Sequence, residues 1–381
     1  MRSSVIASAV VAAIVGFGGT LALIIAAAQA LGATQAQTAS WVTALCLAMF
    51  ISTGFLSWRY KMPIITAWST PGLALIGAST GFTMQQGVGA FIVTAIAIII
   101  TGLVKPVSGL VSKIPASIAS GMLAGVLFAF LTGAARTIPV DPLFVLPLVL
   151  LFFVIRLFNP AMAVLAVLSG GILFAFLSGR VASVPDIGLS TLTLIMPVFD
   201  TRAIIGIALP LYLVTMASQN LPGFAVLRAA GYEPPTAAAL QVTGLLSLLT
   251  APFGAHTSNM AAISAAICTG PDAHPDPAQR WLTGPFYALS YLILAIFGAS
   301  LVALFAVLPA PLIALVAGLA LIGAFANALT IALKNETERL AAVVTFAVTA
   351  SGISIAGIGA AFWALVAGLL VVAFDHAKKH I

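Results

Sequence analysis

The sequence predicts an all-α membrane protein with fourteen transmembrane spans in two inverted seven-span repeats, in which the third and tenth spans are broken. The first observation is composition: 62% of the 381 residues are hydrophobic and 6% are charged, against about 25% charged residues in an ordinary soluble domain. The second is that apolar runs of about twenty residues, enough to cross a bilayer as a helix, recur along the chain. The third is a pair of short polar interruptions at matching places in the two halves.

The apolar runs place seven spans in the first repeat, residues 1–180, and seven in the second, residues 201–381. The segment 181–200 links the repeats and is expected outside the bilayer. Because each repeat holds an odd number of spans, the second repeat enters from the opposite side, as an inverted repeat requires. The expected spans are 5–30, 38–57, 63–79, 87–104, 115–133, 141–157, 160–178, 203–221, 235–251, 256–268, 281–305, 308–332, 339–354 and 356–375.

The first apolar run resembles a signal peptide, because it follows Arg2 and ends at Ala28-Gln29-Ala30. Between residues 5 and 28, however, the run is longer than the roughly 7–15 apolar residues of a signal-peptide core. We therefore expect it to be retained as the first transmembrane span.

Charge placement supports this count and orients the chain. If the N-terminus is cytoplasmic, only Arg136, Arg180 and Arg202 fall on the opposite side, which leaves 12 of the 15 basic residues inside. The positive-inside rule demands this bias, so both termini are expected in the cytoplasm. All nine acidic residues fall in loops or at span ends. Transporters that relay protons or sodium usually keep a carboxylate at mid-membrane, so this site is expected to tolerate or prefer a negative substrate.

The broken spans begin at residues 63–72, PIITAWSTPG, and 252–259, PFGAHTSN. A gapless alignment at an offset of 189 residues superposes Ser69 on Ser258. Each interruption is expected to be an extended approach followed by a half-length helix. The N-termini of such half-helices offer free backbone N–H groups at mid-membrane, where inverted-repeat transporters bind their substrates.

The eighth span carries Gln219 and Asn220 side by side, just before Pro222-Gly223. Burying two amides costs about a few kcal/mol unless they are hydrogen-bonded, so they need either a ligand or protein partners. Interhelical hydrogen bonding is the alternative, since Ser, Thr and Asn commonly join membrane helices.

Other candidate side chains lie in the broken segments themselves. His256 is the lone ionisable side chain expected at membrane depth; an exposed histidine titrates near about pH 6.5, so it is a candidate for proton coupling, and a neutral histidine bonded to a backbone carbonyl is the alternative. Trp68 is suited to stacking on an aromatic substrate or to packing. Ser69 and Thr70 are also suited to capping a half-helix, which places them at its ligand end.

These motifs resemble the BenE-type benzoate:proton symporters of bacteria over nearly the whole chain. The resemblance rests on residues 69–72, 254–259 and 218–223. It implies the seven-plus-seven inverted repeat shared with uracil/xanthine permeases and sulfate-permease-type transporters. In that fold, spans 1–4 and 8–11 form a core domain, and spans 5–7 and 12–14 form a gate domain. Uracil-type permeases read a nucleobase with glutamates in the eighth and tenth spans. Gln219 and the polar cluster around His256 occupy those regions here, which favours a carboxylate.

The function expected is secondary active import of a small aromatic carboxylate, with benzoate as the leading candidate, together with a proton by alternating access. An anion channel, or a transporter of another small anion or a nucleobase, is the alternative. The expected partners are the carboxylate, a proton and the lipid bilayer of a bacterial inner membrane, with a homodimer left open; no nucleic acid, cofactor, metal or enzymatic activity is expected. The residues expected to bind substrate are Ser69, Thr70, Pro71, Gly72, Gln219, Asn220, Thr257, Ser258 and Asn259, with Trp68 as the aromatic contact and His256 as the proton-coupling residue.

Overall fold

The computed structural model describes every residue except 1–2, 105–114, 161, 182–184, 186 and 379–381. Residue 161 of the predicted seventh span and part of the predicted linker therefore lie outside the described residues. Within the described ranges, seven helices are long and apolar enough to cross a membrane, and one further pair, bent by 61° at residue 297, is long and apolar enough together. Each of the fourteen predicted spans coincides with a helix, a helix pair or a short half-helix.

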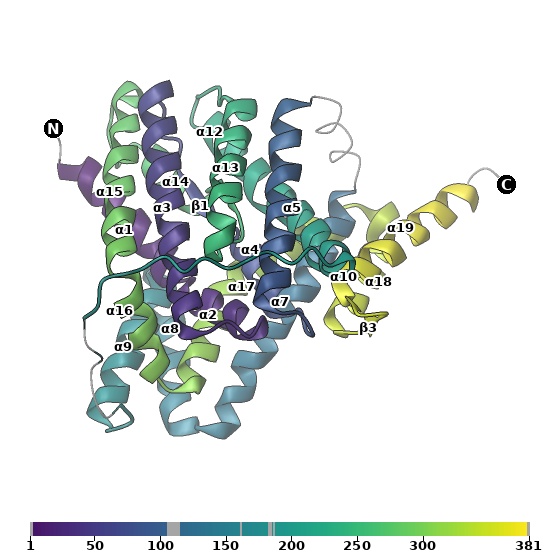
Figure 1. Cartoon of the computed structure of the whole chain (residues 1–381), viewed down its shortest axis with the longest axis horizontal. Helices are drawn as coiled ribbons and strands as arrows, with labels where there is room; N and C mark the ends of the chain where they lie inside the picture. The colour runs from purple at the N-terminus through teal and green to yellow at the C-terminus, as the bar shows by residue number, and fades with distance from the viewer. Residues whose placement is uncertain (1–2, 105–114, 161, 182–184, 186, 379–381) are drawn as a thin grey trace.

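The described elements of the first repeat are helices and one short strand in its third span (Figure 1). A break at Gly19-Thr20 divides the first span into two helices. The elements are α1 (Ser3–Gly18), α2 (Leu21–Ala30), α3 (Gln35–Tyr60), β1 (Thr66–Trp68), α4 (Thr70–Gly77), α5 (Met84–Leu103), α7 (Ala116–Val140), α8 (Pro142–Phe158) and α9 (Ala163–Leu177).

The second repeat follows the same order, with a short strand again before a half-helix. Its eighth span contains two π-helical turns, η1 and η2. The elements are α10 (Thr201–Ala203), η1 (Ile204–Ala208), α11 (Leu209–Thr215), η2 (Met216–Asn220), α12 (Leu221–Ala229), α13 (Thr236–Thr250), η3 (Ala251–Phe253), β2 (Ser258–Met260), α14 (Ile263–Thr269), η4 (Pro277–Leu282), α15 (Thr283–Ile296), α16 (Gly298–Val307), α17 (Ala310–Lys334), η5 (Glu336–Glu338), α18 (Arg339–Ala350), β3 (Ser354–Ile355), β4 (Ile358–Gly359) and α19 (Ala360–Lys378).

Local sequence explains where the long helices α3 and α5 of the first repeat begin. Thr34 and Gln37 form a capping box at the start of α3, and Thr83 and Gln86 form the same box at the start of α5. In each, the Thr side chain accepts from the third helical N–H while the Gln side chain accepts from the Thr N–H, so two unpaired donors are satisfied together. Lys61, in the left-handed region with φ 52°, ends α3 two residues before the first broken span.

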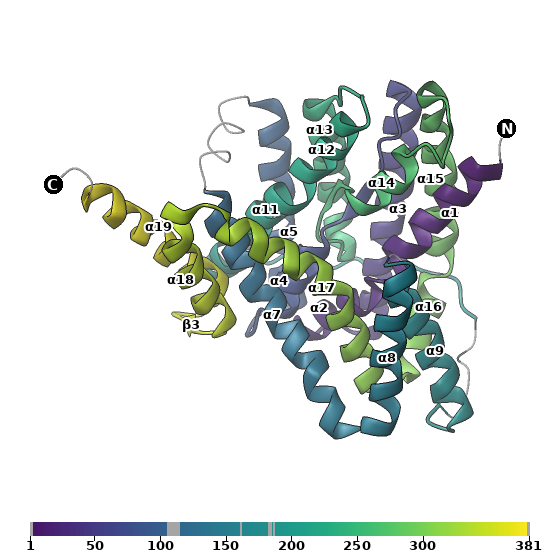
Figure 2. The same ribbon diagram turned by 180° about the vertical axis from the view of Figure 1, so that it is seen from behind.

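The helices pack in two groups. In the first group, α3 and α1 pack on α15, α5 packs on α13, and α2 and α11 pack on α4. In the second group, α7 packs on α17, α18 and α19, and α8 packs on α9 (Figure 2). The groups touch through α4 with α7, α2 with α17, and α1 with α9.

The described part of the segment between the repeats is an extended strap across the first group; it is drawn in teal in Figure 1. Its backbone N–H groups bond to elements of both repeats, so the strap fastens the two halves of this group to one another. The hydrogen bonds run from Ser190 N to Ile296 O (2.9 Å), from Thr193 N to Ser40 Oγ (2.9 Å), from Ile195 N to Pro252 O (2.7 Å) and from Val198 N to Gln85 O (2.9 Å).

Candidate functional site

The two broken spans meet in a two-stranded antiparallel ribbon. β1 and β2 pair with Thr66 opposite Met260, Ala67 opposite Asn259, and Trp68 opposite Ser258. Beyond the ribbon, the N–H of Ala261 donates to the carbonyl of Ile65 at 2.9 Å. Extended backbone at membrane depth has no water to bond, and each strand here supplies the partner for the other.

The register of this ribbon corrects the gapless alignment. Ser69 caps the helix that begins at the next residue, whereas α14 begins only at Ile263, after the capping position Ala262, which makes no side-chain cap. Ser258 therefore lies opposite Trp68 inside the ribbon and is not the counterpart of Ser69. The predicted extended approach and half-length helix are both present in the tenth span, and its helix begins at Ile263, seven residues after the expected start of the span at residue 256.

Ser69 caps the N-terminus of the half-helix α4, as the sequence predicts. Its Oγ accepts from the N–H of Gly72 at 3.1 Å and from the Thr215 hydroxyl of the eighth span at 2.9 Å. Its carbonyl accepts the first α4 hydrogen bond, from Leu73 N at 2.9 Å. A Cβ on Gly72 would lie 2.5 Å from Leu211 Cδ1, so glycine is what lets α4 lie directly on α11. Thr70 follows Ser69 as a half-buried residue, and Pro71 occupies the first turn of α4.

His256 reaches across from the second broken segment to the first. The imidazole is fully buried, and its Nε2 lies 3.1 Å from the carbonyl oxygen of Ser69. On the other side, the indole N–H of Trp41 donates to Nδ1 at 3.3 Å. An indole N–H can only donate, so Nδ1 is the acceptor and Nε2 carries the hydrogen that Ser69 accepts. The rings of Trp41 and Phe91 flank the imidazole, with centroids 5.8 and 6.3 Å away.

The two amides of the eighth span have different environments. Asn220 is buried; its Oδ1 accepts from Met260 N at 3.0 Å and its Nδ2 donates to Met216 Sδ at 3.3 Å. Asn220 thereby joins this span to the edge of β2, as the interhelical alternative describes. Gln219 is half-buried one position earlier. Both lie on the π-helical turn η2, a deformation that often marks functional sites.

The polar residues of β2 and its approach are buried. Thr257 Oγ1 lies 3.5 Å from Thr215 Oγ1, and the N–H of Ser258 donates to Ser247 Oγ at 2.7 Å. Asn259 donates through Nδ2 to Met260 O at 3.0 Å. Within the described residues, the Ser258 Oγ and Asn259 Oδ1 atoms are buried without a hydrogen-bond partner. Buried polar atoms normally find one, so these two have unused capacity to accept a hydrogen bond. Neighbouring strand residues point to opposite faces, so the two atoms flank the ribbon.

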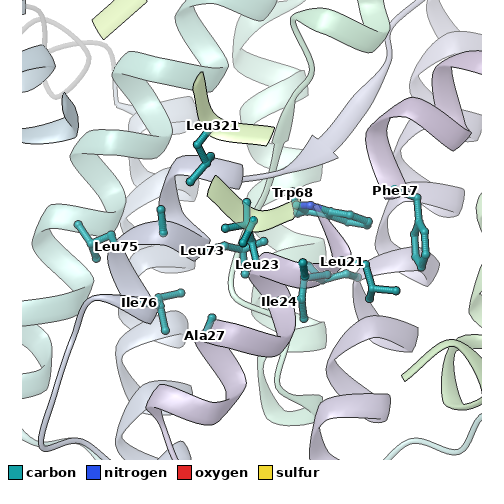
Figure 3. Packing of buried hydrophobic residues seen from close by; sticks show 14 of the residues in the cluster. Phe17, Leu21, Leu23, Ile24, Ala27, Trp68, Leu73, Leu75, Ile76 and Leu321 are labelled. Atoms are coloured by element: carbon teal, nitrogen blue, oxygen red, sulfur yellow. The ribbon is translucent and has the colours of Figure 1, made fainter. Parts of the chain in front are cut away.

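Trp68 lies in an aromatic cluster that sequence reasoning had only partly identified. Its ring meets Phe17 and Tyr291 edge-on, with centroids 5.9 and 5.7 Å away, and its N–H donates to Thr20 Oγ1 at 3.0 Å. Figure 3 shows Trp68 and Phe17 in the buried apolar cluster that also includes Leu321 of α17. The break at Gly19-Thr20 was not predicted, although three glycines stand close together in this part of the apolar run. Nothing in sequence spacing linked Trp41 to His256, because the two lie 215 residues apart.

Two open grooves lie between the two groups of helices. One has a volume of about 340 Å³ and is lined by α2, α16 and α17 residues that include Gln29, Phe305 and Ile313. The other, of about 320 Å³, lies between α2, α7 and α17 and includes Phe130. Both lie where elements of one group face elements of the other.

Comparison with known proteins gives the family. The family model described as benzoate membrane transport protein matches residues 1–374. The inner membrane protein YdcO of Escherichia coli is 42% identical over 361 residues, covering 94% of this chain and 92% of that protein. The benzoate membrane transport protein of Acinetobacter baylyi is 35% identical over the same shares. The transmembrane domain of the cyanobacterial bicarbonate transporter BicA superposes with a TM-score of 0.63 at 17% identity, covering 98% of this chain and 97% of that one.

These matches confirm two predictions. The fold is the seven-plus-seven inverted repeat that BicA shares, and the paired strands before α4 and α14 are its broken third and tenth spans. The resemblance to the BenE family was also correct, since the family model covers almost the whole chain. The chain belongs to the benzoate membrane transport protein family, and it is a membrane transporter rather than an enzyme.

Proposed function

We propose that this transporter imports a small aromatic carboxylate, with benzoate as the leading candidate, together with a proton across the bacterial inner membrane. The relatives support this substrate and location, since one is named for benzoate transport and the other for the inner membrane. The observation that carries the proposal is the ribbon of β1 and β2. It gathers both broken spans and the polar turn of the eighth span, and it leaves Ser258 Oγ and Asn259 Oδ1 buried without protein partners.

The carboxylate would bind beside this ribbon, near Thr70 at the start of α4 and near Asn259, while Ser258 faces the opposite side of β2. The α4 dipole favours an anion at its N-terminus by about 0.3–1 kcal/mol, and by more where water is excluded. In the first turn of α4, the N–H of Gly72 already donates to Ser69 and Pro71 has no N–H, so a ligand at this helix end would meet Thr70. Gln219, half-buried on η2, would orient the carboxylate.

The aromatic ring would lie against Trp68 and Phe17. Aromatic rings prefer edge-to-face or offset contacts, worth about 0.5–1.5 kcal/mol beyond their buried area, and Trp68 already meets two rings edge-on. In this arrangement, Thr257 and Asn220 support the site from behind through Thr215 and Met260.

Alternating access would move the group of spans 1–4 and 8–11 as a core against spans 5–7 and 12–14 as a gate. Three observations support this division. Each group packs mainly on itself, and open grooves follow the boundary between them. The hydrogen bonds named above for the described part of the strap join it to elements of the proposed core. Both termini would lie in the cytoplasm.

The proton would be taken up by His256, whose imidazole contacts the Ser69 carbonyl at the mouth of α4. Protonation would place a positive charge next to the proposed carboxylate. The alternative is that benzoate carries the proton itself as the neutral acid. His256→Gln distinguishes the routes, because glutamine keeps hydrogen bonding but cannot titrate. We expect the variant to retain benzoate counterflow in proteoliposomes and to lose uptake driven by a pH gradient alone. Accumulation of benzoate by the variant under that gradient would assign the proton to the substrate.

The substrate class is tested by thermal unfolding of the purified protein with benzoate, acetate, sulfate, bicarbonate and uracil. Ligands stabilise a protein in proportion to their occupancy, so benzoate should raise the unfolding temperature most, and saturable uptake of radiolabelled benzoate should follow. Stabilisation by uracil or sulfate without an effect of benzoate would refute the substrate. Benzoate flux that does not saturate would indicate a channel.

A further inference from the structure

Trp41 occupies the only position at which His256 can accept a proton. In the neutral imidazole, one nitrogen carries hydrogen and the other holds the free electron pair. Here the Nε2 hydrogen faces the Ser69 carbonyl at 3.1 Å, and the electron pair of Nδ1 receives the Trp41 N–H at 3.3 Å. Trp41 and His256 are both fully buried. Both ring nitrogens therefore take part in hydrogen bonds, and the Trp41 N–H occupies the side of Nδ1 at which a proton would have to bind.

We propose that Trp41 is a lock that determines when His256 can be protonated. The proposal rests on the proposed proton coupling through His256. While the indole N–H donates to Nδ1, the imidazole stays neutral. Its Nε2–H then donates to the Ser69 carbonyl, and this hydrogen bond joins the two broken spans. When the indole turns, Nδ1 is free to take a proton.

When the indole has turned, the aromatic rings around His256 can stabilise the positive charge of the protonated imidazole. The ring centroid of Trp41 lies 5.8 Å from that of the imidazole with the planes tilted, and the centroid of Phe91 lies 6.3 Å away in a T-shaped arrangement. An aromatic face within about 6 Å of a cation attracts it by about 0.5–1 kcal/mol or more when water is excluded. An indole that offers its face in place of its N–H would therefore exchange a hydrogen bond for a cation–π contact.

No charged group takes part in this contact set among the described residues. Around the imidazole, α3 presents Trp41, α5 presents Phe91, and the turn before α4 presents the Ser69 carbonyl. The adjoining Thr257 faces the hydroxyl of Thr215 on α11. None of these groups titrates in the physiological range, so protonation of His256 depends on the position of the indole and on the substrate.

The test uses two variants that separate hydrogen bonding from packing. Trp41→Phe keeps an aromatic ring and removes the N–H, whereas Phe91→Leu keeps the N–H and removes a flanking ring. Titration of His256 is followed by NMR of the full-length protein labelled with ¹⁵N-histidine, and its signal is identified by its loss in His256→Gln. Benzoate counterflow by each variant reports a folded site.

One neutral hydrogen bond is worth about 1 kcal/mol, and one pH unit corresponds to 1.36 kcal/mol. Trp41→Phe should therefore raise the pH midpoint of His256 protonation by about one unit relative to the unaltered protein, and Phe91→Leu should not raise it. In the unaltered protein the neutral signal should be that of the Nε2–H tautomer. The pH profile of benzoate uptake should move in the same direction in Trp41→Phe.

The lock would be overturned if the pH midpoint of His256 protonation is the same in Trp41→Phe and the unaltered protein. It would also be overturned if neutral His256 carries its hydrogen on Nδ1 in the unaltered protein. The lock would also be overturned if His256 stays neutral in both proteins at every pH at which counterflow persists. Failure of the proposed function has a different signature. It would appear as absent benzoate transport in the unaltered protein, which leaves the NMR comparison intact.

Discussion

The eighth span lies so close to the ribbon that a single methyl group should disturb the site. A Cβ on Gly223, in the first turn of α12, would lie 2.5 Å from Met260 Cβ and 2.8 Å from the carbonyl oxygen of Ala261. The second of these atoms is backbone, so a rotamer change cannot relieve the contact. Ordinary contacts of such an atom begin at 3.4 Å, so Gly223→Ala requires α12 and β2 to separate by about 1 Å.

Overpacking of this kind costs about 1–3 kcal/mol. The gain in helix propensity of alanine over glycine offsets about 0.5–1 kcal/mol of that cost. We therefore expect Gly223→Ala to lower the free energy of unfolding by about 1–2 kcal/mol. The separation would also stretch the Asn220–Met260 hydrogen bond, so affinity for benzoate should fall with stability.

The matched control is Gly323→Ala on α17, where an added Cβ has no atom within 4 Å. This variant should gain only the higher helix propensity of alanine, so its free energy of unfolding should equal or exceed that of the unaltered protein. Both variants are compared by chemical unfolding in detergent micelles and by benzoate counterflow. Equal stability of the two variants would refute the close packing of α12 on the ribbon.

Two further variants probe the ribbon and the proposed site. Asn220→Leu removes the acceptor for the buried Met260 N–H, so unfolding measurements should show a loss of about 1–3 kcal/mol, and unchanged stability would contradict the bracing role of Asn220. Thr70→Leu and Asn259→Leu should each abolish the benzoate-dependent rise in unfolding temperature while the proteins remain folded, and undiminished benzoate affinity in both would refute the placement of the carboxylate.

The spans could be located from the sequence alone, because the thickness of the bilayer sets the length of an apolar run that crosses it. Apolar runs located all fourteen spans, and the two polar interruptions located both broken ones. The alignment of those interruptions failed at Ser258, because a gapless match of two short segments cannot reveal that Ala261 and Ala262 separate β2 from α14.

The detailed contacts of the site were beyond sequence reasoning for a different reason. Asn220 was identified as a buried amide in need of a partner, but its partner is a backbone N–H, which every residue possesses. Trp41 gave no signal either, since a tryptophan in an apolar helix has many explanations. Only the three-dimensional arrangement shows that its N–H meets His256.

The ribbon also sets an order on the synthesis of this protein. Ser69 and His256, the residues that join the two broken segments beside the ribbon, are 187 positions apart. While the first repeat emerges from the ribosome, the backbone of β1 has no strand to pair with. Unpaired amides in hydrocarbon cost several kcal/mol each, so the third span cannot settle at its final depth until the tenth arrives. The proposed site therefore cannot form until β2 has been synthesised, and we expect a nascent chain that stalls before residue 260 to hold β1 without its partner strand.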